Sequence, residues 1–349
     1  MRTETRTRFN QYLRGVAADN QFAAEGVMAG QKFTVSPSVQ QRLETKLQES
    51  SEFLKHINII PVIEQQGEAL GLGVAGTIAS TTDTAATDSK GRQTQDIHQL
   101  SAIAYHCQQI NYDTHLRYGT LDMWAKFPDF ARRIGDIKTQ RMALDRIMIG
   151  FNGTSRAATS NRNTNKLLQD VAKGWLEKIR TDAAPRNMKE AEKGSGKIEV
   201  GTGKTYKNLD ALVFSAVSDL IEPQYQDDTE LVAIMSRDLL ADKYFPLYNQ
   251  EKPTEAVAGD LIISQKRVGG LRAVQAPYMP KGTILITRLD NLSIYYQEGG
   301  MRRTIVDNAK FDRVEDYTSS NDDFVVENYE MVALLENIKM VDAPEKADE

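Results

Sequence analysis

Apolar residues recur at helical spacing in several stretches of the chain. The longest such stripe lies in "PDFARRIGDIKTQRMALDRIMIGFNG" and predicts a helix over residues 128–150, with Pro128 at its start and glycines at its end. The apolar face of this helix is expected to consist of Phe130, Ile134, Ile137, Leu144 and Met148. We therefore expect one long helix to organise the fold.

Shorter helices follow from the same spacing. In "SPSVQQRLETKLQESSEFL", Ser36 is the expected N-cap and Pro37 suits the first helical position. A second helix is expected near Lys166 to Arg180, a third over residues 209–220, and a fourth in "SRDLLADKYF" with Ser236 as its cap. In the helix that begins at Pro37, the apolar face consists of Val39, Leu43, Leu47 and Leu54.

Alternation with a period of two marks a different kind of segment between Gly67 and Tyr112. Its first half alternates at Leu70, Leu72, Val74 and Ile78, and its second half at Ile103, Tyr105 and Cys107. The polar stretch "STTDTAATDSKGRQTQD" separates the two halves, so the pattern predicts an extended hairpin with a long tip. A two-stranded ribbon has no core of its own, and we expect it to lie on a partner chain.

The remaining alternating stretches predict further strands. They are "HINIIPVIE", "ELVAIM", "DLIISQ", "RAVQA", "TILITR", "LSIYYQ" and two or three strands after Phe311. Residues 1–31 have too few apolar positions for a core, which predicts a loosely packed helix or a detachable segment. No period of 20–50 residues is present, so the overall class is α+β rather than a solenoid.

Composition, net charge and cysteine content argue against several classes of protein. The 349 residues are 40% apolar and 26% charged, as in ordinary globular chains, and the net charge of -5 argues against a nucleic-acid-binding module. Cys107 is the only cysteine, which excludes an intramolecular disulfide. No apolar run reaches the length of a membrane span, and the N-terminus lacks the apolar core of a secretory signal.

The stretch "GSGKIEVGTGKT" raises the alternative of a P-loop NTPase. A P-loop requires a glycine five residues before its Gly-Lys pair. Ile198 stands there for the second pair and Ala191 for the first. The spacing therefore fails, and a flexible hairpin around residues 193–204, with Ile198 and Val200 as a short strand, is the favoured interpretation.

The histidines and the acidic residues also lack the spacing of a metal site. The four histidines, His56, His98, His106 and His115, have no zinc-ligand spacing. The acidic residues Asp312, Glu315, Asp316, Asp322 and Asp323 lack the spacing of a calcium loop and are expected to form a solvated face or an intersubunit ion pair. No catalytic, cofactor-binding or metal site is predicted, so an enzyme is not expected.

The long helix carries many positive charges. They belong to Arg132, Arg133, Lys138, Arg141 and Arg146. Two interpretations stay open at this point. The charges form a solvated helix face with acidic partners nearby, or they form a surface that faces phosphate.

Several longer blocks resemble one family. They are "MRTETRTRFNQYL", "KFTVSPSVQQ", "LQESSEFLKHINIIPV", "GVAGTIASTTDT", "LLADKYFPLYN", "DLIISQKRVGGL", "LDNLSIYYQ" and "KFDRVEDY". In this order they resemble the major capsid protein of P-two-like tailed phages (peduoviruses). The resemblance extends from Met1 to about Val341 and is weakest over residues 185–206.

The resemblance implies the Hong Kong 97-type capsid fold and its domain organisation. The expected parts are an N-terminal scaffold-like segment (1–33), an N-arm (34–60), an extended loop (67–112), a peripheral domain (113–204) with the spine helix 128–150, an axial domain (205–300), return strands of the peripheral domain (301–341) and a flexible tail (342–349).

The resemblance also implies particular sites. Members lose an N-terminal piece to a phage protease, and the cut is expected near Gln31, Lys32, Phe33 and Thr34. The extended loop is expected to contact neighbouring subunits through Leu70, Leu72, Val74, Ile103 and Tyr105.

The implied function is a shell subunit of a virion, assembled in the host bacterial cytoplasm. Its expected partners are its own copies in hexamers and pentamers, a portal protein, a scaffolding protein, a maturation protease and double-stranded DNA bound without sequence specificity. No cofactor and no membrane partner is expected.

Overall fold

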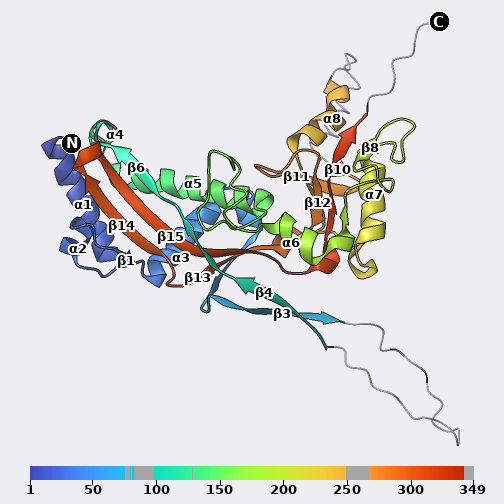
Figure 1. The fold of residues 1–349 in the computed structure, drawn as a ribbon, viewed down its shortest axis with the longest axis horizontal. Helices are drawn as coiled ribbons and strands as arrows, with labels where there is room; N and C mark the ends of the chain where they lie inside the picture. Colours follow the sequence, from blue (N-terminus) through green and yellow to red (C-terminus); the bar gives the residue numbers. More distant parts are fainter. Residues whose placement is uncertain (75–78, 80, 82–97, 128, 249–266, 342–349) are drawn as a thin grey trace, which may run out of the picture.

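Two β-sheets and a long helix organise the chain. The computed structural model describes residues 1–74, 79, 81, 98–127, 129–248 and 267–341. In Figure 1 the long helix α5 lies along the first sheet, the second sheet lies beyond its C-terminal end, and a two-stranded hairpin projects away from both. The mixture of helix and sheet agrees with the predicted α+β class.

The first sheet is built around β15, the longest strand. Its path is β1-β14-β15-β13-β2, and β5 and β6 also pair with β15. The strands are β1 (Phe33–Thr34), β2 (Asn58–Val62), β5 (Gln108–Asn111), β6 (Thr114–Arg117), β13 (Leu292–Gln297), β14 (Arg302–Asn308) and β15 (Arg313–Val326). Strands β2, β13 and β15 were predicted, whereas β14 was not.

Helix α5 spans Phe130–Asn152, close to the predicted range, and Pro128 lies outside the described residues. The predicted apolar face is wrong at Ile137, whose side chain is 53% exposed. The buried face of the C-terminal half instead contains Met142, Arg146 and Ile149. Positions spaced by four and three residues share a helix face, so a buried arginine lies within the apolar stripe.

The predicted second helix begins later than its apolar spacing suggested. Helix α6 spans Trp175–Asp182, and Gly174 is its N-cap residue. Residues 153–174 form a loop in which Leu168 has a left-handed backbone conformation with φ of 58°. A leucine in that conformation interrupts a helix, so the prediction from Lys166 onward is wrong.

The second sheet has the order β10-β11-β9-β12-β16-β7. Its strands are β7 (Asn187–Met188), β9 (Val232–Met235), β10 (Arg267–Val268), β11 (Leu271–Gln275), β12 (Ile284–Thr287) and β16 (Ala333–Leu335). Helix α7 (Leu209–Leu220) packs beside it and is capped by Asn208, whose Oδ1 accepts a hydrogen bond from the Ala211 N–H at 2.8 Å. The predicted strand "DLIISQ" lies outside the described residues.

Two local predictions in this region are wrong. Ser236 precedes helix α8 (Arg237–Tyr248), but its buried hydroxyl has no hydrogen-bond partner in the described parts of the chain and so does not cap the helix. Strand β8 (Ile198–Val200) exists, but it pairs in parallel with β17 (Ile338–Met340) instead of forming a hairpin with its neighbours. A distant partner of this kind leaves no local sequence signal.

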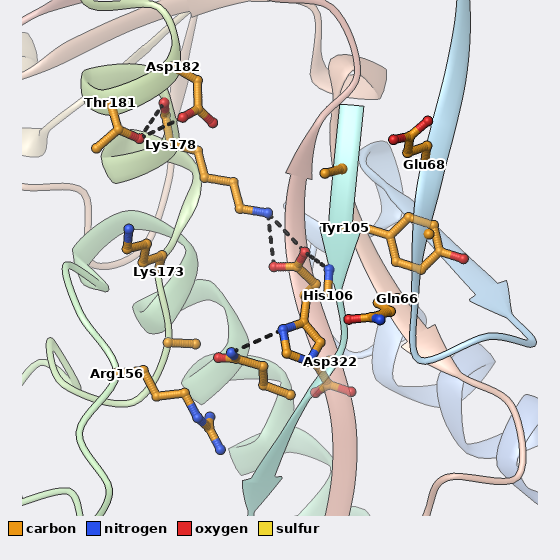
Figure 2. A pocket seen from close by; sticks show the side chains of 15 residues that line it. Gln66, Glu68, Tyr105, His106, Arg156, Lys173, Lys178, Thr181, Asp182 and Asp322 are labelled. Carbon is orange, nitrogen blue, oxygen red and sulfur yellow. Dashed lines mark hydrogen bonds and ion pairs between the residues drawn. The ribbon is translucent and has the colours of Figure 1, made fainter. Parts of the chain in front are cut away.

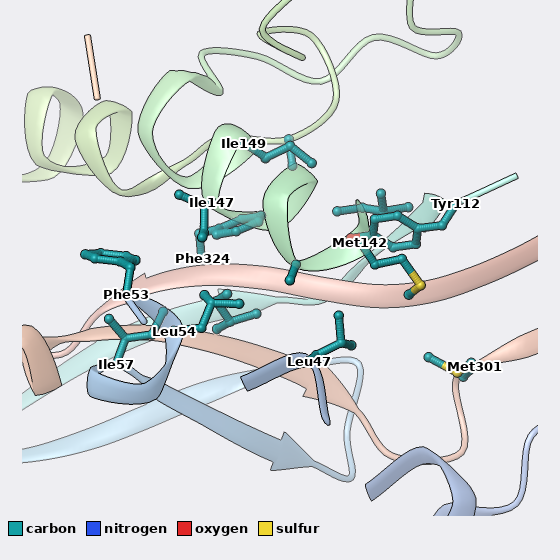
Figure 3. Close-up of a cluster of buried hydrophobic side chains, with 14 of the residues drawn as sticks. Leu47, Phe53, Leu54, Ile57, Tyr112, Met142, Ile147, Ile149, Met301 and Phe324 are labelled. Atoms are coloured by element: carbon teal, nitrogen blue, oxygen red, sulfur yellow. The ribbon is translucent and has the colours of Figure 1, made fainter. Parts of the chain in front are cut away.

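A shared core joins residues 34–60, for which an N-arm was predicted, to the long helix and the first sheet. Helix α3 (Pro37–Glu49) and the short helix after it bring Leu47, Leu54 and Ile57 against Ile147 of α5 and Phe324 of β15 (Figure 3). Ser36 precedes α3 as its N-cap residue, but its side chain does not cap the helix and instead donates to the Asp19 carbonyl at 3.4 Å. Because three elements contribute to one core, the arm is part of the folded body.

The N-terminal segment is more ordered than its composition indicated. It forms α1 (Thr3–Asp19) and α2 (Ala24–Met28). Phe9 and Leu13 are buried in the same apolar cluster as Ile305 of β14. The expectation of loose packing is therefore wrong, because α1 covers an apolar part of the first sheet.

Candidate assembly surface

The projecting hairpin consists of β3 (Gln66–Val74) and β4 (His98–His106). The two strands pair antiparallel, with Leu70 opposite Ala102 and Val74 opposite His98. No other strand in the described ranges pairs with either of them. Both outer edges therefore present backbone N–H and C=O groups without strand partners, an arrangement that invites contact with another chain.

The root of this hairpin is fixed to the first sheet. Cys107 is fully buried where the chain passes from β4 to β5, and its N–H donates to the Gln65 carbonyl at 2.8 Å. The His106 N–H donates to Asp323 Oδ2 at 2.9 Å. The Tyr105 ring packs edge-on against Tyr295 at 5.2 Å between centroids. The hairpin thus leaves the body at a defined position.

The predicted contact residues of the hairpin fall into two groups. Ile103 and Tyr105 pack within the chain against the buried cluster of Cys107, Tyr295 and Val325 and stay partly exposed. Leu70, Leu72 and Val74 lie in the second half of β3, where Leu70 pairs with Ala102 and Leu72 with Leu100. Contact of all five residues with a neighbouring subunit stays a prediction.

A buried ion network holds the arm, the long helix and the first sheet together. Arg146 of α5 is fully buried, as are Glu44 of α3 and Asp322 of β15 to within a few per cent. Arg146 donates from Nε and Nη2 to Asp322 at 3.0 and 3.1 Å, and from Nη2 to Glu44 Oε1 at 3.0 Å. The Tyr112 hydroxyl also donates to Asp322 at 3.0 Å. Burial raises the pKa of Glu44 despite the opposing effect of Arg146.

A second network links the N-terminal segment to the sheet. Arg303 of β14 donates to Asp316 of β15 at 2.7 Å and to the Tyr12 hydroxyl of α1 at 2.8 Å. Lys138 of α5 lies 2.8 Å from the same Asp316 carboxylate. Burial alone would raise the pKa of Asp316, but Arg303 and then Lys138 outweigh it and hold that pKa well below its usual range. Burial also lowers the pKa of Lys138 to about 8.

The two ion networks contain acidic residues that were predicted to form a solvated face or an intersubunit ion pair. Asp322 and Asp323 are buried, and the side chain of Asp316 is 14% exposed. All three pair within the chain, Asp323 with Lys178 at 2.9 Å. Their predicted role as a solvated face or an intersubunit ion pair is therefore wrong. The sequence offered one signal that was missed, because Arg146 lies on an apolar helix face between Met142 and Ile149.

The other cations of the long helix also have acidic partners nearby. Arg132 and Arg133 pair with Asp129 at 3.3 and 2.8 Å, and Arg141 pairs with Asp145. The interpretation as a solvated face with acidic partners holds for Arg132, Arg133 and Arg141. It is wrong for Arg146, which is fully buried, and for Lys138, whose side chain is 13% exposed.

Replacing Asp316 with asparagine should make the free energy of unfolding less dependent on pH. The pKa of Asp316 is lower in the folded chain than in the unfolded chain, so its stabilisation is present above about pH 4 and is lost as the pH falls through the folded pKa. We expect D316N to lose about 2 kcal/mol of unfolding free energy at pH 7 and less at pH 3.5. Urea unfolding at both pH values measures this.

The matched control is D136N, because Asp136 lies on the exposed face of α5 with its side chain 58% exposed. Equal losses for D316N at pH 7 and pH 3.5 would contradict the assignment of the stabilisation to the Asp316 carboxylate.

The expected cleavage region lies where the N-terminal segment meets the first sheet. Gln31 and Lys32 are exposed, whereas Phe33 is buried and starts β1, where it faces Arg303 of β14. The Phe33 ring also stacks on Phe22 at 5.5 Å. A protease would meet exposed residues before Phe33 and, from Phe33 on, a strand paired with β14 in which Thr34 is exposed. Cleavage itself stays a prediction.

The glycine-rich stretch holds one of the chain's own carboxylates. The Gly194 and Gly196 N–H groups both donate to Glu190 Oε2 at 3.0 Å. Hydrogen bonds first from Lys197 and then from Lys204 lower the pKa of Glu199 to about 2. The donors that a phosphate would need are thus engaged by Glu190 and Glu199, and the stretch gives the NTPase alternative no support.

No group of three or more His, Cys, Asp or Glu side chains in the described residues is arranged to hold a metal ion. None of the helices described is both long enough and apolar enough to cross a membrane.

Comparison with known proteins identifies the family. Residues 8–338 match the family described as Phage major capsid protein, P2 family. The chain is 51% identical to the capsid protein of Escherichia phage P2, over 99% of this chain and 98% of that protein. It is 42% identical to the major capsid protein of Serratia phage KSP20, over 97% of both.

A solved structure gives the same result in three dimensions. A chain of the satellite phage P4 procapsid, determined together with its size determination protein, superimposes with a TM-score of 0.79 at 49% identity, covering 98% of this chain and 99% of that one. The predicted resemblance and the Hong Kong 97-type fold are confirmed. The chain belongs to the P2 family of phage major capsid proteins, which form the shell of the virion and have a structural rather than a catalytic role.

Proposed function

We propose that the chain assembles as hexamers and pentamers into an icosahedral shell around double-stranded DNA, and that each hairpin lies across a neighbouring copy. The observation that carries this proposal is the hairpin itself, since no other strand in the described ranges pairs with β3 or β4. Apolar burial contributes about 25 cal/mol per Å², so one such overlap stabilises the shell by several kcal/mol before ordering costs.

The proposed roles of the other parts follow the same organisation. Residues 34–60 serve as the N-arm, 113–204 with α5 as the peripheral domain, 205–300 as the axial domain and 301–341 as the returning strands. The buried Arg146 network supports the first of these roles, because it ties α3 to α5 and to β15. A scaffolding protein, a maturation protease and a portal protein are the further proposed partners.

Proteolytic removal of the N-terminal segment is the proposed maturation step. Helices α1 and α2 cover apolar surface of the first sheet, and Tyr12 shares Arg303 with Asp316. Cutting near Gln31 to Thr34 would release both the cover and this contact. The released surface and the DNA that fills the shell would then favour a rearranged, expanded particle.

Coexpression with a scaffold and a protease of the same phage tests this proposal. We expect negative-stain microscopy to show closed shells, and mass spectrometry of the purified shells to show chains that begin between residues 31 and 34. A protease with an inactivated active site serves as the control and should give shells of intact chains. Mature shells built from the intact chain would contradict the cleavage, and absence of any closed particle would contradict the assembly.

A further inference from the structure

The loop of residues 153–174, between α5 and α6, is an ordered element without helix or strand. The Thr154 N–H donates to the Gln169 carbonyl at 2.8 Å and the Gly174 N–H to the Gly153 carbonyl at 3.0 Å, so its two ends are joined. A Cβ on Gly153 would lie 2.1 Å from the Ala172 carbonyl oxygen, which shows how closely the backbones approach. The loop therefore presents its side chains from a fixed scaffold.

The exposed charges of this loop all have the same sign. Arg156, Arg162, Lys166 and Lys173 are exposed, whereas the single carboxylate, Asp170, is 9% exposed and accepts a hydrogen bond from the Asn161 N–H at 2.7 Å. The chain as a whole has a net charge of -5. The loop is thus a local cationic surface on an acidic protein.

Three of these cations are available to a ligand. Arg162, Lys166 and Lys173 form no ion pair with any residue that the structure describes. Arg162 and Lys166 line a hollow of about 230 Å³ on α5 that also contains Asp113 and Asp145. Asp145 is paired with Arg141, and the charge of Arg162 acts on it more weakly.

Arg156 has a different task. It donates to the Val171 carbonyl at 3.1 Å and to the Gln109 carbonyl at 2.8 Å, and so holds the loop against β5. Figure 2 shows Arg156 and Lys173 on the side of a second hollow formed by the loop, across from the hairpin residue Glu68.

The neutral residues of the loop specify the kind of partner. Around the cations lie threonine, serine and asparagine side chains, and the loop contains no aromatic residue. Hydroxyl, amide and cationic donors bind backbone phosphates, whereas contact with bases needs stacking rings or an element that enters a groove. A surface of this composition fits a polyphosphate backbone and does not read sequence.

The position of the loop agrees with this partner. In Figure 1 the loop lies on the α5 side of β15, and the hairpin β3–β4 leaves on the opposite side. Arg162 and Lys166 line a hollow that contains no hairpin residue, whereas Lys173 lies at the hollow shared with Gln66 and Glu68 of the hairpin.

We propose that the loop of residues 153–174 is the surface through which each subunit contacts packaged double-stranded DNA, with Arg162, Lys166 and Lys173 binding backbone phosphates. This inference rests on the proposed function, in which the shell encloses DNA. It adds which surface of each subunit contacts that DNA.

Formaldehyde crosslinking of DNA-filled shells, followed by peptide mass spectrometry, tests the contact directly. We expect nucleotide adducts on Lys166 and Lys173 in filled shells and none in empty shells. Lys193, Lys207 and Lys281 are exposed elsewhere and serve as internal controls. Filled shells without adducts on the loop, or with equal adducts on the control lysines, would overturn the proposal.

A charge-matched pair of variants gives a second, independent test. R162Q/K166Q/K173Q removes three loop cations and keeps Arg156, and K193Q/K207Q/K281Q removes three cations elsewhere. Binding of each soluble chain to a 20-base-pair duplex is measured against salt concentration. Each lost phosphate contact reduces the steepness of the plot of log K against log salt concentration by about 0.9. The slope of the loop variant should therefore be less steep by about 2 to 3, and the slope of the control variant should be unchanged.

Each outcome of this second test is decisive. Equal slopes for the unaltered chain and both variants overturn the proposal. A loop variant that fails to form shells while its slope is unchanged also overturns it, because the cations then face a neighbouring subunit. Failure of the unaltered chain to form shells would instead contradict the proposed function.

Discussion

Shells should not form from a chain in which residues 71–101 are replaced by Asn-Gly. Leu70 and Ala102 face each other in the hairpin, so a two-residue turn can join them without disturbing the root. The shortened chain keeps Ile103, Tyr105 and Cys107, which pack against Tyr295 and Val325. Folding should therefore survive while the contacts with neighbouring copies are lost.

Two measurements separate assembly from folding in this experiment. Sedimentation should show that the shortened chain stays small under conditions in which the intact chain forms shells. Far-UV circular dichroism and the thermal unfolding midpoint should match those of the soluble intact chain. Normal shells from the shortened chain would show that the hairpin is dispensable, and the proposed mode of assembly would be wrong.

Replacing Arg146 with methionine should destabilise the chain by about 3–5 kcal/mol. In the unaltered chain Arg146 contacts both Glu44 and Asp322. The substitution removes this cation and leaves the two carboxylates buried. Uncompensated carboxylates in a low-dielectric interior are costly, and Glu44 is expected to take up a proton. Denaturant unfolding of the soluble chain at pH 7 measures the loss.

Matched variants identify the cause of that loss. R132M removes a cation from the same helix at a position where the side chain is 70% exposed, and we expect a change within about 0.5 kcal/mol. The triple variant E44M/R146M/D322L removes all three charges together and should recover most of the loss. If R146M unfolds at the same denaturant concentration as the unaltered chain, the network does not stabilise the arm.

The sequence predicted those elements whose signal is local. Period-two alternation around Leu72 and Tyr105 indicated a hairpin, and helical spacing from Phe130 onward indicated α5; both are present. The P-loop spacing is likewise judged from neighbouring residues alone, and the glycine N–H groups of this stretch donate to Glu190. In each case the structure is determined within a short window of sequence.

Predictions failed where long-range partners decide the structure. The apolar spacing that placed Ile137 in the core could not show that Arg146 is the buried residue further along, since its partners Glu44 and Asp322 are distant in sequence. The partner of β8 is likewise a strand near the C-terminus. A search for charged residues within apolar helix stripes would have identified Arg146.

Hydrogen exchange of the hairpin amides tests the central claim most directly. The claim is that neighbouring copies complete this two-stranded ribbon. Residues 70–74 and 98–102, beyond the fixed root of the hairpin, should exchange rapidly in the soluble chain and on the order of a hundredfold more slowly in assembled shells. Equal protection of these amides in the soluble chain and in the shell would contradict the account.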